Sequence, residues 1–224
     1  MQDKKYCYPN STILINKKGI KNANKLYQAE IEYTGARLVE LQQKPIIGDF
    51  DLKYLCKIHK HIFQDLYTWA GKIRTIDIGK GNMFCYVQNI HGFAEIIFGK
   101  YFSSCYSAKD NRELFVEVLA DNYADLNALH PFREGNGRSQ REFARELCLK
   151  CGYVFDLSTT THKEMLDASI HAFNTANNSK LVEIFKKAVI PESEYAKNND
   201  TFLNILTSDD LDIEDIVNSY EYYS

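Results

Sequence analysis

The chain has 224 residues, a length that suits one domain with a substantial core or one domain with an appendage. Its hydrophobic fraction of 45% and aromatic fraction of 13% exclude an intrinsically disordered chain. Residues 191–224 hold nine acidic residues and one basic residue (−8), and the rest hold 26 basic and 21 acidic residues (+5), which is not the charge pattern of a nucleic-acid-binding protein.

The sequence shows no targeting or membrane signal. No run of 18 apolar residues occurs, and the lysines near the start have no apolar stretch behind them. The six cysteines are scattered, as in the reduced thiols of a cytosolic protein, and Cys148 and Cys151 have no second pair to complete a metal site. We therefore expect a cytoplasmic protein with no membrane partner.

Residues 1–190 are predicted to form one mostly helical body after an irregular start over residues 1–19. Apolar residues at spacings of three and four predict helices over residues 21–43, 51–67, 89–103, 110–129, 137–151, 161–175 and 179–189. Pro45 and Gly48 end the first of these helices, and Gly152 ends the fifth. His59 and His61 lie in the second helix. Both are predicted to be structural, because no carboxylates or cysteines recur beside them at metal-ligand spacing.

The pattern changes between Ile73 and Val87. Residues 73–78 alternate apolar and polar side chains, residues 79–82 are turn-forming, and residues 83–87 are β-prone. These features predict a single β-hairpin, so the expected fold class is all-α with one hairpin. The plainer of two interpretations is a surface hairpin that covers the core.

Residues 191–224 are predicted to be an acidic tail. Residues 192–200 are polar and typical of a linker. Residues 208–218 resemble a short helix with Ser208 as its N-cap and acidic residues in its first turns. Its partial apolar stripe predicts that it docks, either by packing on the outside of the body or by bringing its acidic residues to basic ones.

The chain is organised around the twelve residues from His130 to Arg141, His-Pro-Phe-Arg-Glu-Gly-Asn-Gly-Arg-Ser-Gln-Arg. They join two predicted helices, so they form a glycine-containing loop that opens a helix. A helix start presents unpaired N–H groups and a positive dipole end, and glycines let a phosphate approach the backbone. Arg138 lies one turn before Arg141 on the same face, and two guanidinium groups there suit a polyphosphate.

Glu134 is unexpected at a phosphate site, because a carboxylate repels phosphate. A Mg²⁺ ion between them removes the conflict, since it binds carboxylate and phosphate oxygens together. His130 then lies beside the phosphates as a candidate general base. A purely structural helix cap with salt-bridged arginines would leave the convergence of these groups unexplained.

At these positions the sequence resembles the Fic family, whose signature is His-x-Phe-x-Asp/Glu-Gly-Asn-Gly-Arg-x-x-Arg; every fixed position is filled. The segment Tyr67-x-Trp69-Ala70-Gly71-x-x-Arg74 is similar to the family's segment leading into its target-binding flap. The resemblance covers roughly residues 8–190. It implies a Fic-type helical bundle with the hairpin as the flap. It also implies adenylyl transfer, in which AMP moves from ATP to a Tyr, Ser or Thr hydroxyl of a target protein and pyrophosphate is released.

The resemblance implies a role for each matched position. His130 would be the catalytic base, Phe132 a buried anchor and Glu134 the Mg²⁺ ligand. The ATP phosphates would be bound by the N–H groups around Gly135, Asn136 and Gly137, by the Asn136 side chain, by Arg138 (β-phosphate) and by Arg141 (γ-phosphate). The flap that pairs with an extended target segment would comprise Thr75, Ile76, Asp77 and Ile78.

Fic proteins are often restrained by a helix with the pattern Ser/Thr-x-x-x-Glu-Gly/Asn, whose glutamate pairs with the second arginine. Two candidate matches fail at the last position, Thr160-x-x-x-Glu164-Met165 and Ser179-x-x-x-Glu183-Ile184. The resemblance therefore implies a bacterial enzyme whose inhibitor is a separate small antitoxin, or an effector domain delivered into a host cell.

Two other functions stay open at this point. One is a Fic enzyme with another donor, transferring UMP or phosphocholine. The other is a non-catalytic module that binds a phosphate or a partner protein. An intact His130 argues against the module, because binding alone needs no general base.

Overall fold

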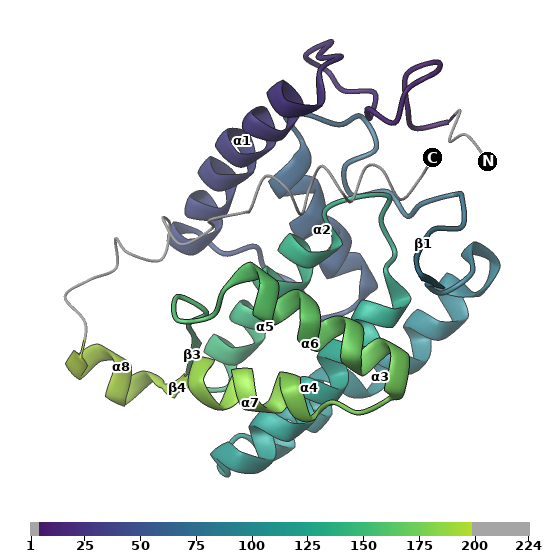
Figure 1. The fold of residues 1–224 in the computed structure, drawn as a ribbon. Coiled ribbons are helices and arrows are strands. Elements are labelled where there is room, and N and C mark those ends of the chain that lie inside the picture. Colours follow the sequence, from purple (N-terminus) through teal and green to yellow (C-terminus); the bar gives the residue numbers. More distant parts are fainter. Residues whose placement is uncertain (1–4, 199–224) are drawn as a thin grey trace.

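The computed structural model describes residues 5–198, which form a bundle of helices (Figure 1). The predicted all-α class is confirmed. The helices are α1 (Ala23–Gln43), α2 (Leu52–Phe63), α3 (Ile90–Ala108), α4 (Arg112–Leu129), α5 (Asn136–Lys150), α6 (His162–Thr175), α7 (Ser179–Ala188) and α8 (Glu192–Asn198), with a 3-10 turn, η1 (Val87–Asn89), before α3. Within residues 5–198 no helix is both long and apolar enough to cross a lipid bilayer.

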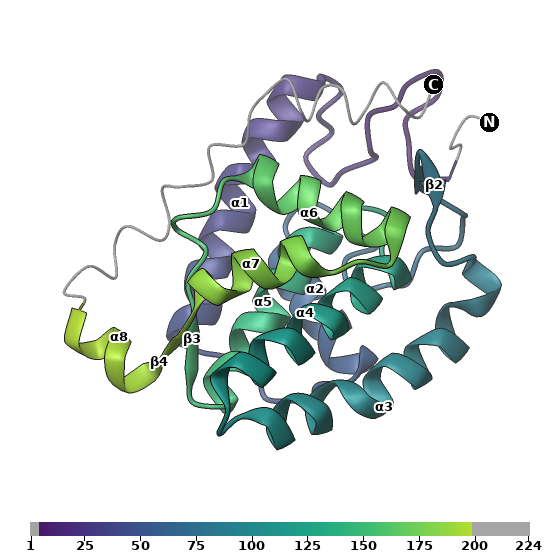
Figure 2. The same cartoon turned by 60° about the horizontal axis from the view of Figure 1, so that its bottom comes forward.

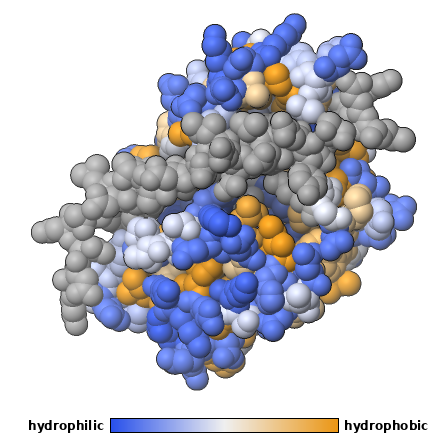
Figure 3. Space-filling model, viewed as in Figure 1, coloured by the Kyte–Doolittle hydropathy of each residue, from blue (hydrophilic) through white to orange (hydrophobic). Residues whose placement is uncertain are grey.

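The core lies between α5 and the helices around it. Helix α5 packs on α2 and α4, and α4 packs on α3, α6 and α7 (Figure 2). Fully buried residues from each layer meet there: Ile58 and Phe63 of α2, Leu119 and Leu126 of α4, Phe143 and Leu147 of α5, and Phe185 of α7. Helix α5, which begins at the signature loop, is therefore packed on several sides. On the face drawn in Figure 3 the described surface is largely hydrophilic, with apolar side chains in small patches.

The helix starts follow local capping chemistry. The side chains of Asn22, Asp51 and Asn111 accept hydrogen bonds from the N–H groups at the starts of α1, α2 and α4. Thr161 and Glu164 form a reciprocal capping box at the start of α6. These caps explain why the predicted starts of α1, α2, α4 and α6 agree with the structure to within about two residues.

The helix ends deviate more from the predictions. Helix α2 ends at Phe63, four residues before the predicted Tyr67, because residues 64–66 form turns that lead into the next segment. Helix α3 runs to Ala108, five residues beyond its predicted end. Its last turns bury Tyr101, Cys105 and Ala108 in the core, so tertiary packing lengthens it.

The predicted hairpin is present but much shorter than expected. Strand β1 (Gly79–Lys80) pairs antiparallel with β2 (Asn82–Met83) around Gly81, which has a positive φ of 73°. Residues 75–78 lie in no strand. The reason is that side chains bond the backbone groups that a longer pair of strands would use. Arg74 donates to the carbonyl oxygens of Ile76 and Cys85, and Asp77 accepts from the Val87 N–H at 2.8 Å.

A second small sheet was not predicted. Strand β3 (Tyr153–Phe155) pairs antiparallel with β4 (Val189–Pro191), with Tyr153 opposite Pro191. These strands are 34 or more residues apart in the chain and form no hairpin, so the predicted single hairpin stands. The chain outside the hairpin is not wholly helical, and neither strand shows a local turn signal that would have marked the pair. The sheet ties the end of α7 to the end of α5.

The expectation of a linker after Pro191 is also wrong for its first residues. Glu192–Asn198 form α8, which contacts β3 and β4, and Tyr195 is buried. The polar composition of this segment concealed the one aromatic residue that packs. The predicted helix near residues 208–218, with the rest of the acidic tail, lies outside the described residues, and the division into a body and a tail stays a prediction.

His59 of α2 is structural, as predicted. The ring is fully buried, its Nδ1 accepts a hydrogen bond from the Gly71 N–H at 2.8 Å, and its Nε2 lies 3.0 Å from the Glu134 carbonyl oxygen. Since Nδ1 accepts, Nε2 carries the proton and donates. The neutral ring thus joins α2 to the turn at Gly71 and to the loop before α5. Burial and the charge of Arg138 lower the pKa of His59 to about 4.

We predict that this buried histidine makes stability fall in mild acid. An unfolded histidine is protonated below about pH 6.5, whereas His59 in the folded protein is protonated only near pH 4. The contribution of neutral His59 to the free energy of unfolding is therefore complete above pH 6.5, and it declines as the pH falls. The free energy of unfolding should drop by about 2 kcal/mol between pH 7.5 and pH 5 through this group.

Urea denaturation at the two pH values measures this effect, and His59→Gln is the matched variant because its amide does not titrate. The variant should be less stable at pH 7.5 yet lose less stability on acidification. An equal drop in both proteins would show that other groups cause the pH dependence.

Candidate active site at the start of α5

The signature loop reverses the chain between α4 and α5. Helix α4 ends at Leu129 and is capped by His130, which adopts a left-handed conformation with φ of 43°. Helix α5 begins at Asn136, directly after Gly135, which also has a positive φ, 78°. The first N–H groups of α5 have no partners inside the helix, so they are directed out of its start. The loop thus combines a histidine at one helix end with an anion-binding start of another.

Phe132 anchors this loop, as predicted. It is 1% exposed, and its ring stacks on His59 with the centroids 3.8 Å apart. Gly135 packs directly on Phe63: a Cβ added there would lie 2.1 Å from Phe63 Cζ. At Gly137 an added Cβ would lie 3.3 Å from Arg141 Nη1, the end of a flexible side chain, so this position is less constrained. Gly135 is therefore the glycine whose close approach to the core shapes the loop.

The Asn136 side chain is hydrogen-bonded within the loop. It is 3% exposed, accepts from the Phe132 N–H at 2.9 Å and donates to the Phe132 carbonyl oxygen at 2.9 Å. Both ends of the amide are thus used to brace the loop. The oxygen and one Nδ2 N–H are engaged inside the loop, and a contact of this side chain with an α-phosphate stays a prediction.

His130 is held in one orientation. Its Nδ1 lies 3.1 Å from the Asn127 carbonyl oxygen, which can only accept, so Nδ1 carries the proton and Nε2 carries the lone pair. The ring stacks on Phe84, which follows β2, with centroids 3.7 Å apart and planes at 8°. This is the tautomer that a general base acting through Nε2 requires.

Arg74, the last residue of the second motif, ties the flap to the loop. It is 1% exposed; its backbone N–H donates to the Pro131 carbonyl oxygen at 2.9 Å and its Nε to the His130 carbonyl oxygen at 2.8 Å. The Cys85 N–H also donates to the carbonyl oxygen of Ala128, at 3.0 Å. The base of the flap and the residues beside His130 are therefore one hydrogen-bonded unit.

The predicted flap residues lie along this unit. Thr75 and Asp77 are exposed, Ile76 is half-buried and Ile78 is buried. The hairpin tip is also attached elsewhere, since Asn82 Nδ2 lies 2.6 Å from Asn174 Oδ1 at the end of α6. The structure thus places the flap next to His130, although not as the extended strand that was expected.

Arg138 is more enclosed than the sequence suggested. Its Nη2 lies 2.6 Å from Glu30 Oε2 of α1, and its guanidinium carbon lies 4.6 Å from the centre of the Phe63 ring. Its Nη2 is also 3.9 Å from Glu134 Oε1. Burial disfavours the charged form, but Glu30 and Glu134 more than offset it, so the pKa of Arg138 is raised.

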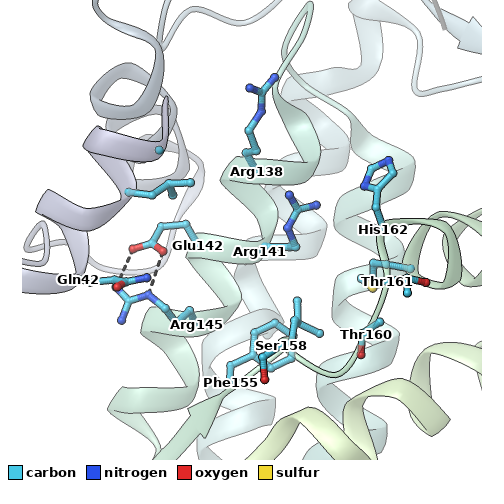
Figure 4. A pocket seen from close by; sticks show the side chains of 14 residues that line it. Gln42, Arg138, Arg141, Glu142, Arg145, Phe155, Ser158, Thr160, Thr161 and His162 are labelled. Carbon is cyan, nitrogen blue, oxygen red and sulfur yellow. Dashed lines mark hydrogen bonds and ion pairs between the residues drawn. The ribbon is translucent and has the colours of Figure 1, made fainter. Parts of the chain in front are cut away.

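Arg141 faces an open cleft. Figure 4 shows Arg138 and Arg141 on successive turns of α5, with His162 on the opposite wall. The cleft runs between α1 and the segment from β3 to α6. Its far end is neutralised, because Arg145 pairs with Glu142 at 2.6 Å. The described residues form no ion pair with Arg141, so it presents a positive charge in the cleft.

Glu134 lies at the loop's surface. Its side chain is 39% exposed, and its Oε1 accepts from the Gly135 N–H at 2.9 Å. Among residues 5–198 no three His, Cys, Asp or Glu side chains are grouped as a metal cage. A single carboxylate beside an anion site suits Mg²⁺, which keeps several waters and shares phosphate oxygens.

Several residues of the site were not identified from the sequence. Glu30, Phe63 and Phe84 each touch a signature residue from another part of the chain. Their spacing along their own segments is that of ordinary packing residues, so no local signal marked them. Tyr67 belonged to the second motif but received no role.

The fold and the site define a helical protein built around an anion-binding helix start. A family model described as "Fic/DOC family" matches residues 49–148. The "Probable protein adenylyltransferase y4lH" of Sinorhizobium fredii is 37% identical over 170 residues, which are 75% of this chain and 87% of that protein. The chain therefore belongs to the Fic/DOC family.

Solved structures agree with this assignment. The BepC protein of Bartonella tribocorum, a VirB-translocated effector crystallised with AMPPNP, superposes with a TM-score of 0.78 at 27% identity over 83% of this chain and 96% of that one. An N-terminal Fic domain from Bartonella quintana with bound ADP gives a TM-score of 0.76 at 30% identity over 86% and 97%. Both similar structures carry an adenine nucleotide.

We predict that Gly135 tolerates no side chain. In Gly135→Ala the new Cβ meets the Phe63 ring while the backbone keeps φ at 78°, so steric overlap adds to backbone strain. The free energy of unfolding should fall by about 3 kcal/mol. Denaturant titration measures this directly.

Gly152→Ala is the matched control, because Gly152 has φ of 85° but open space around its Cβ position. It should cost only about 1 kcal/mol, the penalty of the left-handed backbone alone. Equal losses in the two variants would mean that contact with Phe63 is not the constraint.

Proposed function

We propose that this chain is a protein adenylyltransferase that moves AMP from ATP to a tyrosine, serine or threonine hydroxyl of a target protein. The main support is that His130, a candidate general base, lies beside the N-terminus of α5, the helix that carries Arg138 and Arg141. His130 caps the end of α4, while Arg138 and Arg141 lie on the first turns of α5. The name of the Sinorhizobium relative and the nucleotides in the two Bartonella structures support it.

In the proposed reaction, the target hydroxyl oxygen attacks the α-phosphorus of ATP. The bond from this phosphorus to the oxygen that bridges to the β-phosphate breaks, and pyrophosphate leaves with that oxygen. His130 Nε2 takes the hydroxyl proton, because the Nδ1–H bond to Asn127 leaves the lone pair on Nε2. The stacked Phe84 ring keeps the imidazole in place.

The phosphates would lie across the start of α5. The backbone N–H groups of Asn136 and Gly137 would bind the α-phosphate, Arg138 the β-phosphate and Arg141 the γ-phosphate. Such reactions depend chiefly on positioning and charge stabilisation, and the braced loop supplies both. The Asn136 side chain contributes indirectly, by fixing the loop through Phe132.

The donor set fits a magnesium ion held by Glu134 together with phosphate oxygens. When bound, Mg²⁺ would neutralise phosphate charge and hold the α- and β-phosphates in one geometry. Glu134 would keep its carboxylate at the surface for this purpose, since its bond to the Gly135 N–H fixes it beside the helix start.

The target would present its hydroxyl on an extended segment that pairs with the flap residues Thr75–Ile78. Regulation would come from outside the chain, because Glu164, the glutamate of the nearer partial inhibitory motif, caps α6 by accepting from the Thr161 N–H at 2.8 Å. A small antitoxin with an inhibitory helix could then reach Arg141 through the open cleft. The translocated Bartonella proteins favour an effector role as the alternative.

A first test uses purified chain with Mg²⁺ and α-labelled ATP, alone and with a bacterial lysate. The isolated chain should label itself or a target with AMP, without any added activator. His130→Ala should lower labelling by at least about 100-fold, because the general base is lost. Binding of ATP to this variant should persist.

Three results would decide against parts of the proposal. Full transfer by His130→Ala would remove the base assignment. Labelling from UTP or from CDP-choline instead of ATP would establish another donor, and ATP binding with no transfer at all would favour a binding module. Ile76→Pro separates docking from chemistry, since it should block target modification and leave ATP binding unchanged.

We further predict that Glu134 acts through the metal. Glu134→Ala should lower transfer about 100-fold at low Mg²⁺ and regain part of it at high Mg²⁺ or Mn²⁺, as weaker metal binding is overcome by concentration. Titration of ADP affinity against Mg²⁺ provides a readout separate from activity. A Mg²⁺ dependence identical to that of the unmodified chain would exclude Glu134 as the ligand.

A further inference from the structure

A buried carboxylate lies directly behind Arg138. Glu30, in the middle of α1, is 5% exposed, and its Oε2 is 2.6 Å from Arg138 Nη2. Nothing in the local sequence marks this residue, and the resemblance assigns it no role. It is nonetheless the closest charged partner of a proposed phosphate-binding residue, so its purpose needs an explanation.

The carboxylate of Glu30 is itself fixed. The Tyr67 hydroxyl donates to Oε1, which leaves Oε2 for Arg138. Tyr67 is 1% exposed and its ring stacks on Trp69, so the hydroxyl cannot move far. Tyr67, Glu30 and Arg138 therefore form a buried chain of hydrogen bonds from the second motif to the start of α5.

The guanidinium group is held at further points. Arg138 Nη1 lies 3.3 Å from Thr34 Oγ1, one turn after Glu30 on α1, and the group lies over the Phe63 ring. An arginine has five N–H donors in a rigid plane. Fixing two of its nitrogens on the α1 side fixes the direction in which its other donors point.

We propose that Glu30 is a positioning residue that holds the Arg138 guanidinium ready for the β-phosphate, and that Tyr67 holds Glu30. This inference rests on the proposed function. A flexible arginine would have to be ordered when the nucleotide binds, and the entropic cost of that ordering would weaken binding. Preorganisation by Glu30 removes the cost before ATP arrives.

The opposite role, competition between Glu30 and phosphate, fits the geometry less well. Both oxygens of Glu30 are engaged inside the protein, and releasing Arg138 would leave a buried carboxylate without its counter-charge. A phosphate arriving from the cleft can instead bind the outer side of the guanidinium group while Glu30 keeps the inner side. One arginine can hold both anions because its donors point in different directions.

Calorimetric titration of AMP and of ADP, each with Mg²⁺, tests this. The readout is the gain in affinity from AMP to ADP, because Arg138 is assigned to the second phosphate. Glu30→Ala should reduce this gain about tenfold and leave AMP affinity unchanged, which is the lower end of the loss caused by removing a residue that orients a metal ligand. Tyr67→Phe should act in the same direction more weakly.

Two comparisons separate positioning from general damage. Glu30→Ala added to Arg138→Ala should cause no further loss of ADP affinity, since Glu30 acts only through that arginine. Asp65→Asn is the control, because it breaks the 2.7 Å pair between Arg37 of α1 and Asp65 of the turn after α2. It should leave both affinities unchanged.

Each other outcome is decisive. A rise in ADP affinity in Glu30→Ala would show competition instead of positioning, and equal losses for AMP and ADP would show a structural role only. Should Glu30→Ala fail to fold, Tyr67→Phe gives the same test. Failure of the unmodified chain to bind either nucleotide would overturn the proposed function itself, which is a different result.

Discussion

The stacking of Phe132 on His59 is the contact on which the geometry of the site depends. The loop between α4 and α5 contains two left-handed residues, His130 and Gly135, and it would not hold one shape in isolation. Helix α2 provides the surface that shapes it: the His59 ring lies under Phe132, its Nε2–H binds the Glu134 carbonyl oxygen, and Phe63 leaves room only for a glycine at position 135. The phosphate-binding helix start is therefore positioned by apolar packing, and its polar groups are left for a ligand.

Three arginines near this loop have three different environments, and the difference explains their roles. Arg74 is buried and donates to backbone carbonyl oxygens, so it joins the flap to the general base. Arg138 is paired with Glu30 on one side and directed by it. Arg141 faces the cleft and has no ion pair with the described residues. All three carry the same charge, so burial and partners distinguish their roles. Arg74 is structural, Arg138 is held in place for a phosphate, and Arg141 is accessible to one.

The differences between expectation and structure have two causes. Residues 73–87 were expected to form long paired strands from their alternation, but the Arg74 and Asp77 side chains satisfy backbone groups that strands would otherwise pair. The β3–β4 sheet and helix α8 were missed because their partners lie far away along the chain. The hairpin was therefore shortened by side-chain bonds within residues 74–87, whereas the sheet and α8 depend on distant partners that no local pattern records.

The sequence by itself determined the helical class, most helix starts and the identity of the signature residues. Those features depend on neighbours within one or two turns, such as apolar spacing, capping side chains and glycines beside a helix start. Only the tertiary structure decided which histidine is buried, how long the hairpin is, and that Glu30 and Tyr67 stand behind Arg138. The contacts of Glu30 join groups 37 and 108 residues apart in the chain, and no local pattern records which distant side chains meet.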